Sequence, residues 1–266
     1  MPIVTLVTTL HDSSGWSIEH LKEHTSLFDE LYERRLVVVT RGTSMGVVEA
    51  LQGTGWTLVS QRSKVGVEYI SDSRRRVLQA GLESGSKFMH IIDMDRLLHW
   101  AKHYPEELRE ITSFIPSHKF LIIGRTDRAF STHPRNQTET ETLANKVFSL
   151  IYGKDVDITG ASRGVSKEAT EIILKSSRGI YFDSDSEWPT LLLTAGVEIG
   201  YVEVEGLEWE TRLKRHEMKL PDGRRVDVKN YYESNPESWV YRTMLAYRIA
   251  KMALNTYRGI QETKVE

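Results

Sequence analysis

Two carboxylates follow a short apolar run in the first half of the chain, and their spacing could hold a metal ion. Residues 88–100 read "FMHIIDMDRLLHW", so Asp93 and Asp95 flank a single residue and Arg96 comes next. If the backbone is extended there, both carboxylates point the same way and form a chelating pair of hard oxygen ligands. Such a pair suits Mg²⁺ or Mn²⁺ holding a diphosphate. Alternatively, a carboxylate at a strand end caps the next helix or pairs with Arg96.

The elements that must position these carboxylates alternate along the chain. Apolar residues at three- and four-residue spacings predict helices over 16–33, 69–83 and 104–115. Short apolar, β-branched runs predict buried strands at 3–9, 35–40, 56–60, 88–93 and 119–124. This alternation predicts an α/β fold, a Rossmann-like, mainly parallel sheet with helices on both faces. Ligands bind at the carboxyl ends of such strands, and the two aspartates fall at one of these ends.

The second half of the chain has a looser pattern. It predicts a polar loop over 125–140, helices over 139–153, 166–177 and 186–196, and a strand within 197–206. A final helix spans about Glu237 to Tyr257, where Leu245, Ile249 and Ala253 form part of an apolar stripe. We therefore expect a single domain with an elaborated second half, in which a C-terminal loop and helix, 211–266, pack on residues 1–210.

Composition and charge exclude several classes of protein. The 35 Lys and Arg residues nearly balance the 37 Asp and Glu residues, so no global field attracts nucleic acid. The chain has no cysteine, which excludes disulfides and thiolate chemistry. No apolar run is long enough to span a membrane, and the first residues lack the features of a signal peptide, so we expect a cytoplasmic protein. Its oligomeric state stays open.

The order of several segments resembles the GT-A glycosyltransferases of the family 2 type. The resemblance covers about residues 3–210 and rests on "RRRVLQAGLESGSKFMHIIDMD", "FLIIGRTDR", "VDITGASRGVSKEA" and "EWPTLLLTAGVEIGYVEVE". In that family an Asp-x-Asp motif ends the fourth strand. It binds a divalent metal, Mn or Mg, and the nucleotide-sugar donor.

The resemblance implies roles for individual residues. Asp93 would face the donor ribose or the metal, and Asp95 would bind the metal that neutralises the diphosphate leaving group. "GASRGVSKEA" resembles the acceptor-side segment of the family, which places Arg163 near the active site as a catalytic candidate. "SEWPTLLLTAG" aligns with the stretch that begins with the catalytic carboxylate, which nominates Glu187. Thr40 and Arg41 stand where the family has a base-binding aspartate, so the identity of the nucleotide stays open.

Basic residues near these motifs are candidates for holding phosphate. Arg125, Arg128, His133 and Arg135 crowd the stretch after the 119–124 strand, where guanidinium groups could bind a diphosphate or an anionic acceptor. Alternatively, they are solvated loop residues. The run "SRRRV" raises the same two interpretations. There, Arg75 and Arg76 are donor-binding candidates because a basic residue of the family approaches the nucleotide in this region.

Histidines supply the remaining candidates. Many GT-A enzymes bring a histidine from the end of the core to the metal, and His216 in "RLKRHEMKLPDG" occupies that part of the chain. Its alternative is a solvated loop residue. His99 and Trp100 closely follow the Asp-x-Asp motif and could line a sugar pocket, although a core role for Trp100 fits equally well.

The sequence thus predicts a metal-dependent glycosyltransferase that moves a sugar from a nucleotide-sugar donor to an unidentified acceptor. Whether it inverts or retains the anomeric centre stays open. One alternative is a non-catalytic sugar-nucleotide-binding or scaffold protein of the same fold. Another is a phosphoryl-transfer enzyme that uses Asp93 as its nucleophile, although such enzymes normally carry their Asp-x-Asp motif after the first strand.

Overall fold

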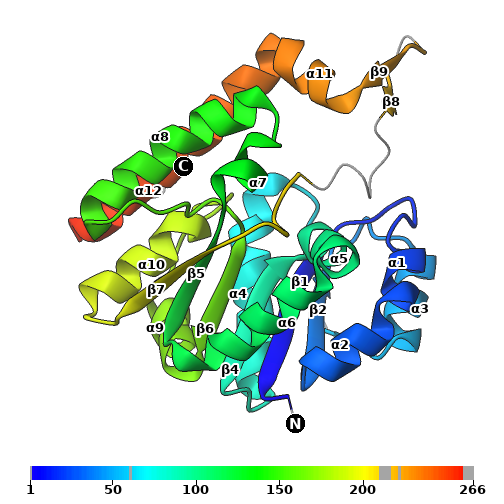
Figure 1. The fold of residues 1–266 in the computed structure, drawn as a ribbon, viewed down its shortest axis with the longest axis horizontal. Helices are drawn as coiled ribbons and strands as arrows, with labels where there is room; N and C mark the ends of the chain where they lie inside the picture. The colour runs from blue at the N-terminus through cyan, green and yellow to red at the C-terminus, as the bar shows by residue number, and fades with distance from the viewer. Residues whose placement is uncertain (1, 60–61, 210–216, 221–222, 260–266) are drawn as a thin grey trace.

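One mixed sheet forms the centre of the molecule (Figure 1). The computed structural model describes residues 2–59, 62–209, 217–220 and 223–259. Its main sheet has the strand order β3-β2-β1-β4-β6-β5-β7, in which only β6 runs antiparallel to its neighbours. The strands are β1 (Val4–Leu10), β2 (Arg34–Val39), β3 (Thr57–Leu58), β4 (Phe88–Asp93), β5 (Phe120–Arg125), β6 (Ser162–Ser166) and β7 (Ile199–Val204). The predicted mainly parallel α/β sheet is confirmed.

Strand β2 illustrates why these segments become interior strands. Successive side chains of a strand point to opposite faces of the sheet. Leu36 and Val38 therefore join the core on one face, whereas Val37 and Val39 join the core on the other. All four are buried, which accounts for a continuous apolar run instead of an alternating one.

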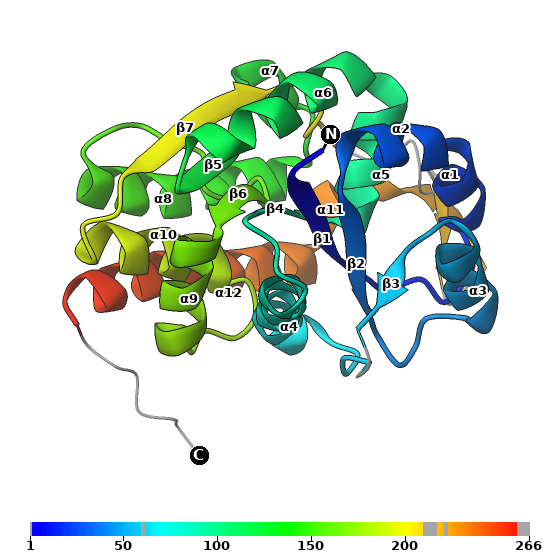
Figure 2. The same ribbon diagram turned by 90° about the horizontal axis from the view of Figure 1, so that it is seen from below.

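Helices cover both faces of the sheet. One face carries α1 (Ile18–Glu23), α2 (Thr25–Leu31), α3 (Met45–Gly53), α5 (Met94–His103) and α6 (Pro105–Phe114). The other face carries α4 (Ile70–Glu83), α8 (Arg135–Tyr152), α9 (Lys167–Ser176), α10 (Ser184–Thr194) and α12 (Pro236–Tyr257). Figure 2 shows α4, α9 and α12 below the sheet and α2, α5 and α6 above it.

Shorter elements connect these layers. They are η1 (Val67–Tyr69), η2 (Ile115–Ser117), α7 (Asp127–Ser131), β8 (Glu217–Lys219), β9 (Arg225–Asp227) and α11 (Val228–Ser234). Strands β8 and β9 pair antiparallel in a separate two-stranded sheet.

Two sequence predictions for the second half of the chain were wrong in part. The predicted loop over 125–140 contains the end of β5, the helix α7 and the first turns of α8. Strand β6 was not predicted, because its five residues, "SRGVS", include polar and small side chains. All five are buried, because β6 lies between β4 and β5 in the middle of the sheet. Position in the sheet outweighs local β-propensity here.

The C-terminal helix α12 runs beside α8, as Figure 1 shows at its upper left. Leu245, Ala246, Ile249 and Ala253 of α12 are buried, so the predicted apolar stripe is the packed face. A division of the chain at residue 210 remains a prediction.

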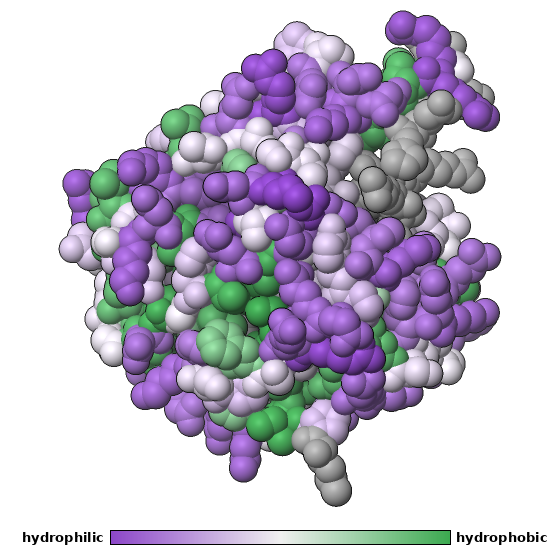
Figure 3. Space-filling view, in the orientation of Figure 1, coloured by the Kyte–Doolittle hydropathy of each residue, from purple (hydrophilic) through white to green (hydrophobic). Residues whose placement is uncertain are grey.

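No helix in the described part of the chain is long and apolar enough to cross a membrane. Hydrophilic side chains cover most of the face shown in Figure 3.

A close contact joins the segment after β7 to α5. A Cβ atom added at Gly206 would overlap with the indole of Trp100, which is fully buried. We expect Gly206→Ala to lower the free energy of unfolding by about 1–3 kcal/mol, because a packed core resists added volume. Urea denaturation measures this change.

Gly53→Ala is the matched control. A Cβ atom there meets no other group within 4 Å, and the residue ends α3. Its stability should stay equal to that of the parent or rise slightly. Equal stabilities for both variants would contradict the proposed contact.

Candidate active site at the carboxyl edge of the sheet

A first cavity, the N-terminal cavity, lies where β1 and β2 end. Its volume is about 480 Å³. Leu10, Val38 and Ile70 supply apolar wall, and His11 and Thr40 supply polar atoms. The Nδ1 atom of His11 lies 2.6 Å from the Oγ1 atom of Thr40, so the side chains that follow two neighbouring parallel strands meet at this edge. The arrangement offers a slot with apolar sides and a polar end.

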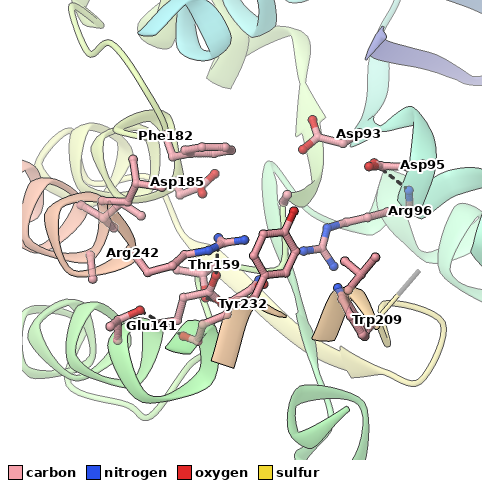
Figure 4. A pocket seen from close by; sticks show the side chains of 17 residues that line it. Asp93, Asp95, Arg96, Glu141, Thr159, Phe182, Asp185, Trp209, Tyr232 and Arg242 are labelled. Atoms are coloured by element: carbon pink, nitrogen blue, oxygen red, sulfur yellow. Dashed lines mark hydrogen bonds and ion pairs between the residues drawn. The ribbon is translucent and has the colours of Figure 1, made fainter. Parts of the chain in front are cut away.

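A second cavity, the C-terminal cavity, adjoins the first and is shown in Figure 4. Its volume is about 460 Å³. Segments far apart in the sequence build its wall, which combines acidic, basic and aromatic side chains. Those that Figure 4 labels are Asp93, Asp95, Arg96, Glu141, Thr159, Phe182, Asp185, Trp209, Tyr232 and Arg242.

Asp93, Asp95 and Phe182 line both cavities. The two carboxylates therefore lie where the cavities meet, at the carboxyl end of β4, which is the edge where ligands bind in open α/β sheets. A molecule bound in one cavity and a molecule bound in the other would both reach this pair of side chains.

The backbone between the two aspartates is not extended throughout. Asp93 has extended dihedral angles and is the N-cap residue of α5, which begins at Met94. Asp95 therefore lies in the first turn of a helix, and the conditional prediction of a fully extended Asp-Met-Asp was wrong. The Oδ1 atom of Asp95 accepts a hydrogen bond from the backbone N–H of Arg96 at 3.0 Å. Figure 4 nevertheless shows both carboxylates at one rim of the cavity.

Arg74 of α4 connects the two sides of the site. Its guanidinium donates to Oδ2 of Asp93 at 2.9 Å and to Oδ1 of Asp185 at 2.7 Å. A third donation reaches the hydroxyl of Ser184 at 3.0 Å. Arg74 is buried, and the two carboxylates raise its pKa above the ordinary value, so it stays charged. One buried cation thus holds a carboxylate of β4 and a carboxylate of α10 in fixed positions.

Asp185 is the carboxylate that α10 presents to the C-terminal cavity. It is only 6% exposed, and burial raises its pKa above the usual value, although Arg74 and Arg163 act in the opposite direction. A carboxylate with a raised pKa in a cleft is suited to accepting a proton.

Glu187 points elsewhere, so its predicted place in the active site is not what the structure shows. Side chains two positions apart on a helix point about 200° apart, so Asp185 and Glu187 cannot share a face. The Glu187 carboxylate accepts hydrogen bonds from the backbone N–H groups of Arg178 at 2.6 Å and Gly179 at 2.9 Å. The hydroxyl of Ser177 donates a third at 2.5 Å. Glu187 holds the loop before α10 and is absent from the described lining of both cavities.

The guanidinium of Arg125 is buried and forms hydrogen bonds with several side chains of the protein. Its guanidinium donates to both carboxylate oxygens of Asp157, at 2.7 and 2.9 Å, and to Glu141 and Thr159, each at 2.7 Å. The buried cation lowers the pKa of Asp157 well below its usual range, and the carboxylates raise the pKa of Arg125. Because Glu141 and Thr159 line the C-terminal cavity, Arg125 supports its floor and is not itself a free phosphate ligand.

Arg163 lies beneath the site. It belongs to β6, is buried, and donates to the carbonyl groups of Ser162 at 2.5 Å and of Ile158. A longer contact of 3.4 Å joins it to the carbonyl of Asp185. Arg163 therefore supports the backbone that carries Asp185 and does not line either cavity within the described residues.

The other predicted cations lie outside both cavities. Arg75 and Arg76 line a separate groove, in which Arg76 pairs with Asp72 at 2.7 Å and Arg75 donates to the carbonyl of Gly179 at 2.6 Å. Arg135 is exposed at the start of α8 and pairs with Glu139 at 2.8 Å.

The histidines divide in the same way. His99, Trp100 and His133 are buried and do not belong to the described lining of either cavity. Trp100 belongs to the core cluster, and Nε2 of His99 lies 3.1 Å from Glu208. His216 lies outside the described residues.

Sequence reasoning missed several residues that the structure brings together. Arg74, Glu141, Asp185 and Arg242 are among the charged ones. For Arg74 a signal existed, because it shares the three- and four-residue spacing of the buried positions Val77, Leu78 and Gly81. For Arg242, on α12, no local signal places it beside a site formed by β4 and α5.

Backbone strain accompanies the site. Ala161 and Tyr181 are the described non-glycine residues with positive φ, at 58° and 48°. Ala161 lines the C-terminal cavity, and Tyr181 directly precedes Phe182, which lines both cavities. Such left-handed residues persist where surrounding structure imposes them, often at functional sites.

Several solved structures resemble this one. A mycobacterial protein aligns with 98% of this chain and 76% of its own length, with a TM-score of 0.63 and 12% sequence identity. Glucosyl-3-phosphoglycerate synthase from Mycobacterium tuberculosis, with Mn²⁺, UDP and glucosyl-3-phosphoglycerate, aligns with 98% of this chain and 82% of its own, with a TM-score of 0.55 and 10% identity. The same synthase with Mg²⁺ and UDP gives a TM-score of 0.56 at 11% identity, over 98% of this chain and 81% of its own.

Sequence comparison adds nothing to these likenesses. No protein-family profile matches this chain, and no curated protein matches it in sequence. At such low identity the structural likeness shows the fold alone, which is the GT-A type that this chain shares with the synthase.

The network around Arg125 gives a stability prediction. We expect Arg125→Gln to lower the free energy of unfolding by about 3–5 kcal/mol, because it leaves buried carboxylates without their cation. Urea denaturation should show the loss at low and high salt alike, since buried pairs are little screened.

Arg135→Gln is the matched control, because Arg135 forms an exposed pair and its loss should change stability by less than about 1 kcal/mol. If the Arg125 variant is as stable as the parent but binds nucleotide weakly, the structural role of Arg125 is wrong.

Proposed function

We propose that this chain is a glycosyltransferase that moves a sugar from a nucleotide-sugar donor to an acceptor hydroxyl with the help of a divalent metal. The observation that carries the proposal is that two cavities meet at Asp93 and Asp95 on the carboxyl edge of a GT-A sheet. A transferase needs two substrates whose reacting atoms approach each other at one place. Similarly folded enzymes crystallised with UDP and a divalent metal support the choice of donor and metal.

Asp93 and Asp95 fit a bound Mg²⁺ or Mn²⁺ ion. Both offer carboxylate oxygens, which these hard cations prefer. Arg74 donates to Oδ2 of Asp93, whereas among the described residues Oδ1 accepts a long hydrogen bond of 3.4 Å from the hydroxyl of Thr9. The side chain of Asp93 is 24% exposed, so a ligand can reach it. When bound, the metal would neutralise the charge of the departing diphosphate.

The N-terminal cavity is the proposed site of the nucleotide. Its apolar walls suit a flat base, and the paired side chains of His11 and Thr40 can exchange hydrogen bonds with polar base edges. Lys64 adds a cation to the same wall. Asp93 and Asp95 at the far end would hold the metal and, through it, the diphosphate.

The C-terminal cavity is the proposed site of the acceptor. Arg96 and Arg242 are cations in its wall, and Trp209 and Tyr232 are aromatic. These groups suit an acceptor that combines an anionic group with a sugar or other hydroxyl-bearing part. If the reaction inverts the anomeric centre, Asp185 is the side chain positioned to deprotonate the acceptor hydroxyl, in place of Glu187.

A binding screen with a hydrolysis assay tests the proposal. Nucleotide sugars, each with and without Mn²⁺, are tested by thermal shift, and the donor that binds is then assayed for slow metal-dependent hydrolysis. A ligand at about 100 times its dissociation constant should add about 2.7 kcal/mol of stability. Asp93→Asn should abolish the Mn²⁺-dependent part of this stabilisation and the metal-dependent hydrolysis.

Other outcomes would identify the alternative functions. Binding without turnover in the presence of varied acceptors would favour a scaffold protein. Release of phosphate from simple monoesters would favour phosphoryl transfer with Asp93 as the nucleophile.

Replacing the two carboxylates of α10 separates their roles. For an inverting reaction we expect Asp185→Asn to lower turnover by about 10²–10⁴-fold with little change in donor affinity, because a general base acts in the transition state. Glu187→Gln should instead lower stability and leave the turnover of the folded fraction near the parental value. Near-parental turnover of the Asp185 variant would remove Asp185 from this role.

The pH dependence of turnover provides a second test of Asp185. A base works when deprotonated, so its raised pKa places the acidic limb of the rate profile above the range of an ordinary carboxylate. The Arg74 cation favours the charged form of Asp185. Arg74→Gln removes this cation, so the pKa of Asp185 should rise further and the acidic limb should move to still higher pH. A limb that does not move would contradict the coupling between the two residues.

A further inference from the structure

A histidine-rich cluster lies apart from the residues that line the two cavities, at the junction of α1 and α2. The sequence there is "HLKEH", in which His20 and Glu23 belong to α1 and His24 separates α1 from α2. The metal-ligating atoms of these three side chains all lie within 4.8 Å of one another. Among the described residues, these are the three histidine or carboxylate side chains that lie close enough together to hold one metal ion.

The distances suit coordination of one small cation. Oε2 of Glu23 lies 3.5 Å from Nδ1 of His20 and 3.7 Å from Nε2 of His24. Ligand atoms about 2.0–2.1 Å from a tetrahedral zinc ion lie roughly 3.3–3.4 Å apart. Small side-chain rotations would therefore complete such a site.

The ring nitrogens that face Glu23 lack other partners. Nδ1 of His20 and Nε2 of His24 are buried and have no hydrogen-bond partner among the described residues. His24 itself is only 8% exposed. A buried polar atom without a hydrogen-bond partner is destabilising, and a bound cation would satisfy both nitrogens at once.

We propose that His20, Glu23 and His24 bind a zinc ion through Nδ1, Oε2 and Nε2, with water in the fourth position. Two imidazoles and one carboxylate form a ligand set that zinc accepts, whereas Mg²⁺ prefers oxygen alone. The ammonium group of Lys102 lies 4.0 Å from Oε2 of Glu23 and competes with the ion for this carboxylate. Lys102 is 38% exposed in its side chain and can turn toward solvent when zinc binds.

This site is independent of the proposed transferase chemistry. It lies on α1 and α2, and its ligands differ from the all-carboxylate pair Asp93 and Asp95. Zinc there would fix the junction between the two helices.

Calorimetry on the full-length chain tests the proposal. Protein freed of metal by chelation is titrated with Zn²⁺ in excess Mg²⁺, which saturates sites made of carboxylates alone. We expect one zinc ion per chain. Mutating a residue that hydrogen-bonds to a metal ligand typically weakens metal affinity by about 10–100-fold. Loss of a ligand itself, in His20→Gln or Glu23→Gln, should therefore weaken zinc binding by at least about 100-fold. Asp93→Asn should bind zinc like the parent.

Glu19→Gln is the matched control, because Glu19 is an exposed carboxylate on the same helix. Its zinc affinity should equal that of the parent. Glu23 is also largely exposed, with 52% of its side chain accessible, so Glu23→Gln should fold, as circular dichroism will verify. Replacing zinc with Co²⁺ should give the visible absorption of a tetrahedral site in the parent and not in Glu23→Gln. Absence of stoichiometric zinc, or equal affinities in the parent, His20→Gln and Glu23→Gln, would overturn the proposal.

Discussion

The arrangement of the candidate active site depends on one buried cation, Arg74. Its guanidinium reaches the carboxylate at the end of β4 and the carboxylate at the start of α10, which lie on segments about ninety residues apart in sequence. A buried charge is tolerated only when it is paired and hydrogen-bonded. The stability of the buried Arg74 charge therefore depends on the positions of both Asp93 and Asp185. The separation of these two carboxylates is therefore set by contacts within the protein.

A second buried cation, Arg125, plays the same part on the floor of the C-terminal cavity. It holds Asp157 on the loop before β6 and Glu141 on α8, and through Glu141 and Thr159 it shapes the cavity wall. Both arginines thus use positive charge to organise carboxylates, and neither is a free phosphate ligand. Two other arginines line this cavity, Arg96 from α5 and Arg242 from α12. Arg96 donates to the carbonyl of Leu207 at 3.3 Å, and Arg242 lies 3.8 Å from the carboxylate of Glu141.

The C-terminal helix completes the site by closing it from the side. Arg242, Leu245, Ala246 and Ile249 of α12 line the C-terminal cavity, and Ala246, Ile249 and Ala253 also belong to the core cluster on that face of the sheet. The hydroxyl of Ser186 on α10 donates to the carbonyl of Ile249 at 2.6 Å, and Arg248 pairs with Asp183 at 2.6 Å. These contacts attach α12 to the helix that carries Asp185, so the shape of the C-terminal cavity depends on how the last helix packs.

The sequence by itself determined the fold class, because apolar runs of strand length alternating with helical spacings leave few arrangements other than a mainly parallel α/β sheet. It also located Asp93 and Asp95 at a strand end, since the run "FMHIID" ends there. Only the tertiary structure decided which charged residues face the site. The orientation of α4 brings Arg74, and not Arg75 or Arg76, to the site. The orientation of α10 likewise brings Asp185 there, and not Glu187. Strand β6 and the contribution of Arg242 depend likewise on contacts between distant segments. Residue type and local spacing do not encode those contacts, because burial between elements, and not propensity within them, sets their free energy.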